Sequence, residues 1–205
     1  MRARIIRQLA ALARFYAPLF GGRNLIITNT VSSGFLLGTA DVIQQSLERR
    51  KNPTRKWDTD RAVHMFITGC TMGPLLHYWY SWVDKITPRK GIQHVKVVII
   101  KVAIDQGFAP FFGCWYFTMM GLLQGHSLAE SLKEFREKFW DYYLAELTLW
   151  PAAQMINFLF LPPHYRVMFV NVVTLGWNVY LHDFQKLSPC PLSPPPAQIL
   201  FEDDG

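Results

Sequence analysis

The chain has 205 residues, of which 50% are hydrophobic and 18% are charged, and its formal net charge is +6 at pH 7. Ordinary soluble domains carry about 25% charged residues, and the basic residues here gather between apolar stretches, which favours a membrane protein with charged loops over a nucleic-acid-binding domain. The three cysteines, Cys70, Cys114 and Cys190, form no CxxC pair and no disulfide framework, so they give no reason to expect a secreted protein.

The N-terminal segment, residues 1–22, is basic and amphipathic. Arginines alternate with apolar residues there, and the first acidic residue of the chain is Asp41. An arginine-rich, acid-free start is typical of a mitochondrial targeting segment. The alternative is a basic interfacial helix ahead of a membrane span. No long apolar run follows the arginines, which argues against a secretory signal.

Residues 23–186 form the expected membrane domain. A membrane-spanning helix needs about 20 mostly apolar residues. Five windows lack Asp, Glu, Lys and Arg, and the second and third are comfortably long enough: 24–40, 62–83, 106–129, 147–165 and 167–182. We predict an all-α integral membrane bundle of about four transmembrane helices plus amphipathic interfacial helices. A soluble helical bundle would have to explain long stretches with so few charges.

The segments between the windows have distinct characters. A basic loop occupies 48–57, and a turn-rich loop opens at 84–91. Residues 130–146 place aromatic and apolar side chains at helical spacing with charges on the remaining face, which predicts an amphipathic helix at the interface or over the bundle end. Pro162 and Pro163 disfavour helix just before them, so we expect a break near Leu161. One kinked span, two spans, and one span with an interfacial helix all remain open.

The distribution of basic residues does not predict which side of the membrane each loop faces. Alternating spans put the N-terminal segment and the 84–96 loop on one side, and the 48–61 loop and residues 130–146 on the other. Each side then holds nine basic residues. The positive-inside rule therefore predicts no topology. The tail, 187–205, is rich in proline and is expected to be extended or disordered.

Three Gly-xxx-Gly pairs lie in or at the edge of apolar windows. A pair on one helix face lets another backbone approach closely. Together they predict tight helix packing: Gly34 with Gly38, Gly69 with Gly73, and Gly121 with Gly125.

Ionisable and amide side chains inside or just beside the apolar windows are candidate functional residues, because polar groups are costly at membrane depth. Lys101 and Asp105, four residues apart on a helix, are expected to form an internal ion pair, or else to be solvated near the interface. His77 is a candidate for titration near neutral pH or a packing residue. The other candidates in or just beside the first three windows are Asp41, Gln44, Gly73, Pro74 and Gln106.

The run from Trp150 to Phe158 combines a proline with two carboxamides. Pro151 bends the backbone, and Gln154 and Asn157 lie one helical turn apart. Buried amides are costly unless they find partners. We expect both side chains to face polar residues of earlier helices inside the bundle.

The sequence contains none of the common catalytic motifs. There is no HExxH, no Cys/His metal spacing, no Walker loop, no GxGxxG after a strand and no GxSxG elbow. We therefore expect a protein that is not an enzyme, with no cofactor and no metal.

Several of these residues stand in an order that resembles the Mpv-seventeen/peroxisomal membrane protein family of small four-span organelle membrane proteins. Leu147 stands where the family has a second tryptophan. The ordered residues are Asp41-xx-Gln44-Gln45, Asp60-Arg61, Gly69-xxx-Gly73-Pro74-xx-His77-xx-Tyr80, Lys101-xxx-Asp105-Gln106, Trp150-Pro-xx-Gln-xx-Asn-Phe158, Arg166 and Trp177-xx-Tyr180-Leu181.

Within the family, the amino-acid sequence at residues 72–80, 136–140 and 175–177 resembles that of the Mpv-seventeen-like protein two branch. That resemblance implies the mitochondrial inner membrane and a role in assembly or stability of the mitochondrial ribosome. Other members of the family resemble channel-like pores in function, so the resemblance also implies a second hypothesis: this protein is a channel for small solutes or ions. The expected partners are membrane lipid, mitochondrial ribosomal subunits or their assembly intermediates and, as an open alternative, further copies of this chain. The residues identify no small-molecule substrate.

Overall fold

The computed structural model describes residues 17–86 and 94–184, and these residues form helices joined by short connections, with no strand among them. This confirms the predicted all-α class. The predicted N-terminal segment (up to residue 16) and the tail lie outside the described residues. The elements are η1 (Ala17–Phe20), α2 (Asn24–Lys51), α3 (Thr59–Ile86), α4 (His94–Leu123), α5 (Leu128–Phe160), η2 (Pro163–Tyr165) and α6 (Arg166–Phe184).

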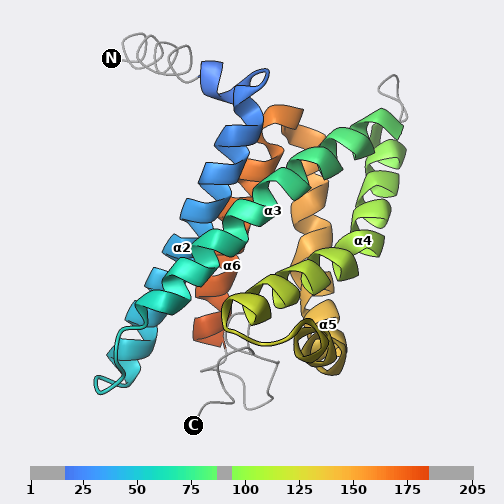
Figure 1. Cartoon of the computed structure of the whole chain (residues 1–205). Coiled ribbons are helices and arrows are strands. Elements are labelled where there is room, and N and C mark those ends of the chain that lie inside the picture. The colour runs from blue at the N-terminus through green and yellow to red at the C-terminus, as the bar shows by residue number, and fades with distance from the viewer. Residues whose placement is uncertain (1–16, 87–93, 185–205) are drawn as a thin grey trace.

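Long apolar helices fit a membrane bundle. In the described part of the chain, α2 and residues 95–123 of α4 are long and apolar enough to cross a membrane. At 28 and 33 residues, α3 and α5 also exceed the length that a span needs, but each carries several charges. Helix α4 bends in its middle, where Pro110 removes a backbone donor (Figure 1).

Two groups of helices make up the bundle. Helix α2 packs closely against both α3 and α6, and α4 packs against α5. The two groups meet along smaller faces, between α3 and α4 and between α5 and α6. In Figure 1, α3 runs diagonally across the front of the bundle, with α4 at its right and α6 behind it.

The closest packing joins α2 to α3 through glycines of the first two Gly-xxx-Gly pairs. A Cβ on Gly69 would lie 2.5 Å from the Ser33 carbonyl oxygen, and a Cβ on Gly73 would lie 2.6 Å from the Thr30 Cα. Only glycine allows the two backbones to approach this closely, as the pattern predicts.

The third Gly-xxx-Gly prediction is wrong, because Gly125 lies outside the helix. Its φ of 90° is one that other residues rarely adopt, and it ends α4. The His126 N–H donates to the Gly121 carbonyl at 2.9 Å, which closes the last turn. The charge-free window 106–129 is therefore not one span: α4 begins twelve residues earlier, at His94, and ends at Leu123.

Helix boundaries also differ from prediction around residues 84 and 147. Asp84 was expected to open a loop, but α3 continues to Ile86 and buries Asp84. The amphipathic segment 130–146 is not a separate helix, because α5 runs without interruption to Phe160. A capping box starts α5: Ser127 Oγ accepts from the Glu130 N–H at 3.3 Å, and Glu130 Oε2 accepts from the Ser127 N–H at 2.7 Å.

The predicted break at the prolines is confirmed. Leu161, just before Pro162, takes an extended conformation (φ −99°, ψ 132°), so α5 ends one residue earlier at Phe160. A short 3-10 turn, η2, then leads into α6. Because α5 and α6 are separate helices, the alternative of one kinked span is wrong.

The loops fall at the two ends of the bundle as alternating spans require. Figure 1 shows the turn between α2 and α3 at the same end as the first turns of α5. The end of α3 and the start of α4 lie together at the opposite end.

Candidate functional site

A buried ion network holds the α2–α3 turn. Arg61 Nε lies 2.6 Å from Asp41 Oδ1, and Arg61 Nη1 lies 3.3 Å from Glu48 Oε2. Gln45 donates to Asp41 at 2.6 Å and to the Asp58 carbonyl at 2.7 Å. Asp41 is therefore half of a buried pair rather than a free acid. Its role here is to fix the turn, since breaking a buried pair is costly.

A second cluster joins α3, α4 and α6. Asp84 Oδ1 accepts from Lys101 Nζ and from Arg166 Nη1, each at 2.6 Å. Both cations also lie over the Phe158 ring of α5, at 5.6 Å for Lys101 and 5.0 Å for Arg166. The predicted ion pair between Lys101 and Asp105 is wrong, as is the alternative of two solvated charges. Both side chains are buried, and Lys101 turns back along α4 to Asp84 on the neighbouring helix.

The remaining candidates of α2 and α3 contribute mainly to packing. His77 Nδ1 lies 3.1 Å from Asn29 Nδ2, which ties α3 to α2. Gly73 makes the close backbone approach described above, and Pro74 lies inside α3. Gln44 is buried, and neither atom of its amide has a hydrogen-bond partner among the described residues.

Gln154 and Asn157 face the interior of the bundle, as their spacing predicts. Gln154 Nε2 donates to the Tyr80 hydroxyl at 2.8 Å, and Asn157 Nδ2 donates to Gln154 Oε1 at 2.9 Å. Near them, the Trp79 indole donates to Asp105 Oδ1 at 2.8 Å. Asp105 thus receives its described hydrogen bond from a neutral donor. Pro151 lies inside α5 and does not end it.

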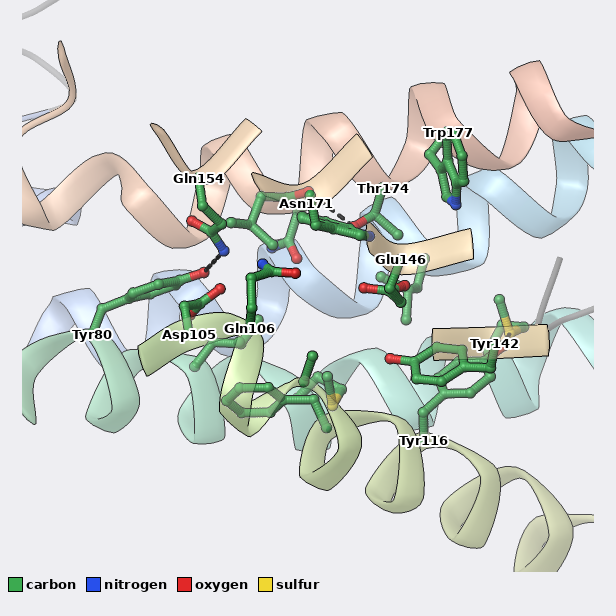
Figure 2. Close-up of a pocket in the computed structure, with 18 residues that line it drawn as sticks. Tyr80, Asp105, Gln106, Tyr116, Tyr142, Glu146, Gln154, Asn171, Thr174 and Trp177 are labelled. Carbon is green, nitrogen blue, oxygen red and sulfur yellow. Dashed lines mark hydrogen bonds between the residues drawn. The ribbon is translucent and has the colours of Figure 1, made fainter. Parts of the chain in front are cut away.

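A cavity of about 150 Å³ lies between the two helix groups. Figure 2 shows Tyr80, Asp105 and Gln154 near one end, Gln106 in the middle, and Glu146 with Tyr142 toward the other end. Of the predicted site residues, Asp105, Gln106, Trp150 and Gln154 line it, whereas Asp41, Gln44, His77 and Asn157 do not. The other lining residues are Leu37, Met65, Met72, Leu76, Tyr80, Ala109, Phe112, Tyr116, Tyr142, Glu146, Val170, Asn171, Thr174 and Trp177.

Glu146 is the most consequential cavity residue that the sequence reasoning missed. It is the last residue of segment 130–146, and the sequence pattern assigned it neither to the apolar face nor to the charged face of that helix. Stepping back from Gln154 by four residues gives Trp150, Glu146 and Tyr142, all on one face of α5. That periodicity was the available signal. Trp150 points its indole N–H toward Glu146 but makes no hydrogen bond of ordinary geometry.

Comparison with known proteins identifies relatives across most of the chain. The Mpv17 / PMP22 family model matches residues 121–182. The mitochondrial inner membrane protein Mpv17 of Caenorhabditis briggsae is 32% identical over 180 residues, which cover 87% of this chain and 94% of that protein. Mpv17 of Mus musculus is 33% identical, covering 74% and 85%. PXMP2/4 family protein 4 of Dictyostelium discoideum is 32% identical, covering 76% and 84%. No solved structure matches.

Relatives named as mitochondrial inner membrane proteins, together with the helical membrane fold, place the protein in the mitochondrial inner membrane. The chain belongs to the Mpv17 / PMP22 family.

Proposed function

We propose that this inner-membrane protein has a non-enzymatic role: it supports assembly and stability of the mitochondrial ribosome, and hence mitochondrial translation. The observation that carries the proposal is the basic turn, defined here as residues 49–56, which comprise the last residues of α2 and the turn that follows it. Its cationic side chains are all exposed: Arg49, Arg50, Lys51, Arg55 and Lys56. Clustered exposed cations are suited to phosphates of ribosomal RNA.

The basic turn is held in a defined shape, which distinguishes it from a loose charged loop. The Arg61–Asp41 pair and the Gln45 bonds to Asp58 fix the two helix ends beneath it. Arg49 stacks over the Trp57 ring at 5.8 Å. A pre-shaped cationic surface loses less conformational freedom on docking.

The charged start of α5 lies at the same end of the bundle as the basic turn (Figure 1). Lys133, Arg136 and Glu137 are exposed there. A ribosomal particle that approached this end would meet both surfaces, so the proposal requires that this end face the matrix. The resemblance to the Mpv-seventeen-like protein two branch supports the same role.

Sucrose-gradient sedimentation of mitochondrial extracts tests the proposal. We expect the wild-type protein to migrate with ribosomal subunits or their precursors and to leave those fractions as salt rises, because phosphate contacts release counterions. The variant Arg50→Gln/Lys56→Gln should dissociate from the ribosomal fractions at a lower salt concentration than the wild-type protein does. The matched control, Lys85→Gln/Lys96→Gln, removes two exposed cations from the opposite end and should behave as wild type. Absence of comigration for wild type would refute the proposal.

A second candidate function is passage of small solutes or ions through the bundle, favoured by the cavity between the two helix groups. Asp105 lines that cavity and places a carboxyl group within the apolar bundle. Purified protein in planar bilayers should then show a conductance that Asp105→Ala alters. An identical conductance in the variant would count against this function. Both activities are compatible, because the basic turn and the cavity use different residues.

A further inference from the structure

The cavity between the helix groups is acidic as well as polar. Its lining includes two carboxyl side chains, Asp105 and Glu146, and no described Lys, Arg or His. Neither acid has an ion-pair partner among the described residues, since Lys101 and Arg166 are both held by Asp84. An ionised carboxylate in an apolar interior is costly without a counter-charge. The cavity therefore favours a cation over an anion.

Two buried polar atoms of the lining also lack partners. Gln106 Oε1 has no hydrogen bond among the described residues, and it is an acceptor situated between the two acids (Figure 2). Trp150 Nε1 is a second such atom, but it is a donor directed toward Glu146, so it does not itself favour a cation. A group that donates several hydrogen bonds, such as an ammonium, would pair with Gln106 Oε1, and the negative charge of the two carboxylates on either side would attract it.

The rest of the cavity lining is mainly apolar and is suited to contact the carbon chain of a ligand. Aromatic rings surround the polar atoms, and rings attract cations through their faces: Tyr80, Phe112, Tyr116, Tyr142, Trp150 and Trp177. No group of three or more His, Cys, Asp or Glu side chains able to hold a metal ion occurs among residues 17–86 and 94–184. Hard divalent cations prefer six or more oxygen ligands. An organic cation matches this mixed lining better than a metal ion.

We propose that the cavity binds a small protonated alkylamine, with its ammonium group near Gln106, where Asp105 and Glu146 both attract it, and its carbon chain against the aromatic rings. Cavities of about 150 Å³ in proteins accept a molecule as large as benzene, so a chain of a few carbons fits. This assignment rests on the same cavity as the second proposed function and names its ligand class. It requires only that the amine enter the cavity, not that it cross the membrane.

A saturation-transfer NMR titration of full-length protein in a neutral detergent tests the assignment. The probes are n-butylammonium and 1-butanol, which have the same size and differ in charge. We expect saturable binding of n-butylammonium and at least about tenfold weaker binding of the alcohol. Equal binding of both probes would overturn the proposal, because the carboxylates would then contribute nothing. If K⁺ displaced n-butylammonium at a similar concentration, the cavity would not prefer an organic cation, and that part of the proposal would be wrong.

Isosteric variants locate the site. Asp105→Asn keeps an acceptor for the Trp79 indole, and Glu146→Gln keeps the side-chain volume, so both should fold. Each should weaken n-butylammonium binding at least about tenfold. The matched control is Glu137→Gln on the same helix, whose side chain is 63% exposed and lies outside the cavity lining. Equal losses in all three variants would assign the binding to surface charge and refute the site.

Binding and conductance are measured separately, so the two ideas fail separately. Saturable amine binding without conductance would retain the site and reject the channel. Conductance that neither isosteric variant alters, with no amine binding, would reject the site and leave a pore elsewhere in the assembly.

Discussion

At the residue scale, Asp84 connects three helices. It accepts from Lys101 and Arg166, so one carboxylate joins α3 to α4 and to α6. All three charges are buried. Removing one partner of a buried ionic cluster leaves uncompensated charge. Asp84 therefore contributes to the way the two helix groups are held together.

We predict that Asp84→Ala lowers the free energy of unfolding by about 3–5 kcal/mol, because Lys101 and Arg166 would be left as unpaired buried cations. The measurement is chemical unfolding of the purified protein in detergent. The neighbouring Lys85→Ala removes an exposed charge and should change stability by less than about 0.5 kcal/mol. Equal effects of the two substitutions would contradict the role given to Asp84.

The amide chain of α5 leads to a prediction at the same scale. Gln154→Leu with Asn157→Leu leaves the Tyr80 hydroxyl without its donor, which removes a hydrogen bond between α5 and α3, and also removes the Asn157–Gln154 bond within α5. Each unsatisfied buried group costs about 1–3 kcal/mol. We expect reduced accumulation of this double variant in mitochondria, measured by immunoblot against wild type. Normal accumulation combined with lost function would show that the amides act in function rather than in packing.

At the element scale, α2 and α3 depend on glycine where their backbones meet. Gly73→Ala would bring a Cβ within 2.6 Å of the Thr30 Cα, which cannot move without shifting the helix. Overpacking of this kind costs about 1–3 kcal/mol. Gly107→Ala is the matched control, because no atom lies within 4 Å of its added Cβ. Thermal unfolding should show a lower midpoint for the first variant only.

The start of α5 depends on the capping box. Hydrogen bonds from Ser127 hold the pKa of the exposed Glu130 below its usual value. The pKa of Glu130 is lower in the folded than in the unfolded protein, so ionised Glu130 stabilises the folded state. That stabilisation is fully present above the unfolded pKa and is lost as pH falls through the folded pKa. We expect Ser127→Ala to speed hydrogen exchange in the first turn of α5 at neutral pH. Unchanged exchange there would exclude a stabilising role for the box.

The helical class and the helix break at the prolines followed from the sequence, whereas several helix ends and the partners of the buried charges did not. The prolines at 162 and 163 act on their own neighbours, so the end of α5 was predictable. Lys101 had a local candidate in Asp105, but the structure brings Asp84 closer from another helix. Gly125 has the right spacing for a packing pair, yet its positive φ places it past the helix end. Glu146 belongs to a cavity that only the meeting of two helix groups creates.

At the scale of the whole molecule, the bundle separates two surfaces. The cavity lies between the helix groups, and the basic turn lies at one end of the bundle, the same end as the charged start of α5 (Figure 1). The buried Arg61 network connects the basic turn to the α2–α3 pair rather than to the cavity. Substitutions in the basic turn should therefore change partner binding without changing the cavity.

The most direct measurement is pulse labelling of mitochondrial translation products in cells that lack this protein and are complemented with single variants. Support of the mitochondrial ribosome through the basic turn predicts that wild type and Lys85→Gln/Lys96→Gln restore labelling. Arg50→Gln/Lys56→Gln should restore it only in part, at equal protein level. Full restoration by that variant, or normal labelling in cells without the protein, would contradict the proposed function.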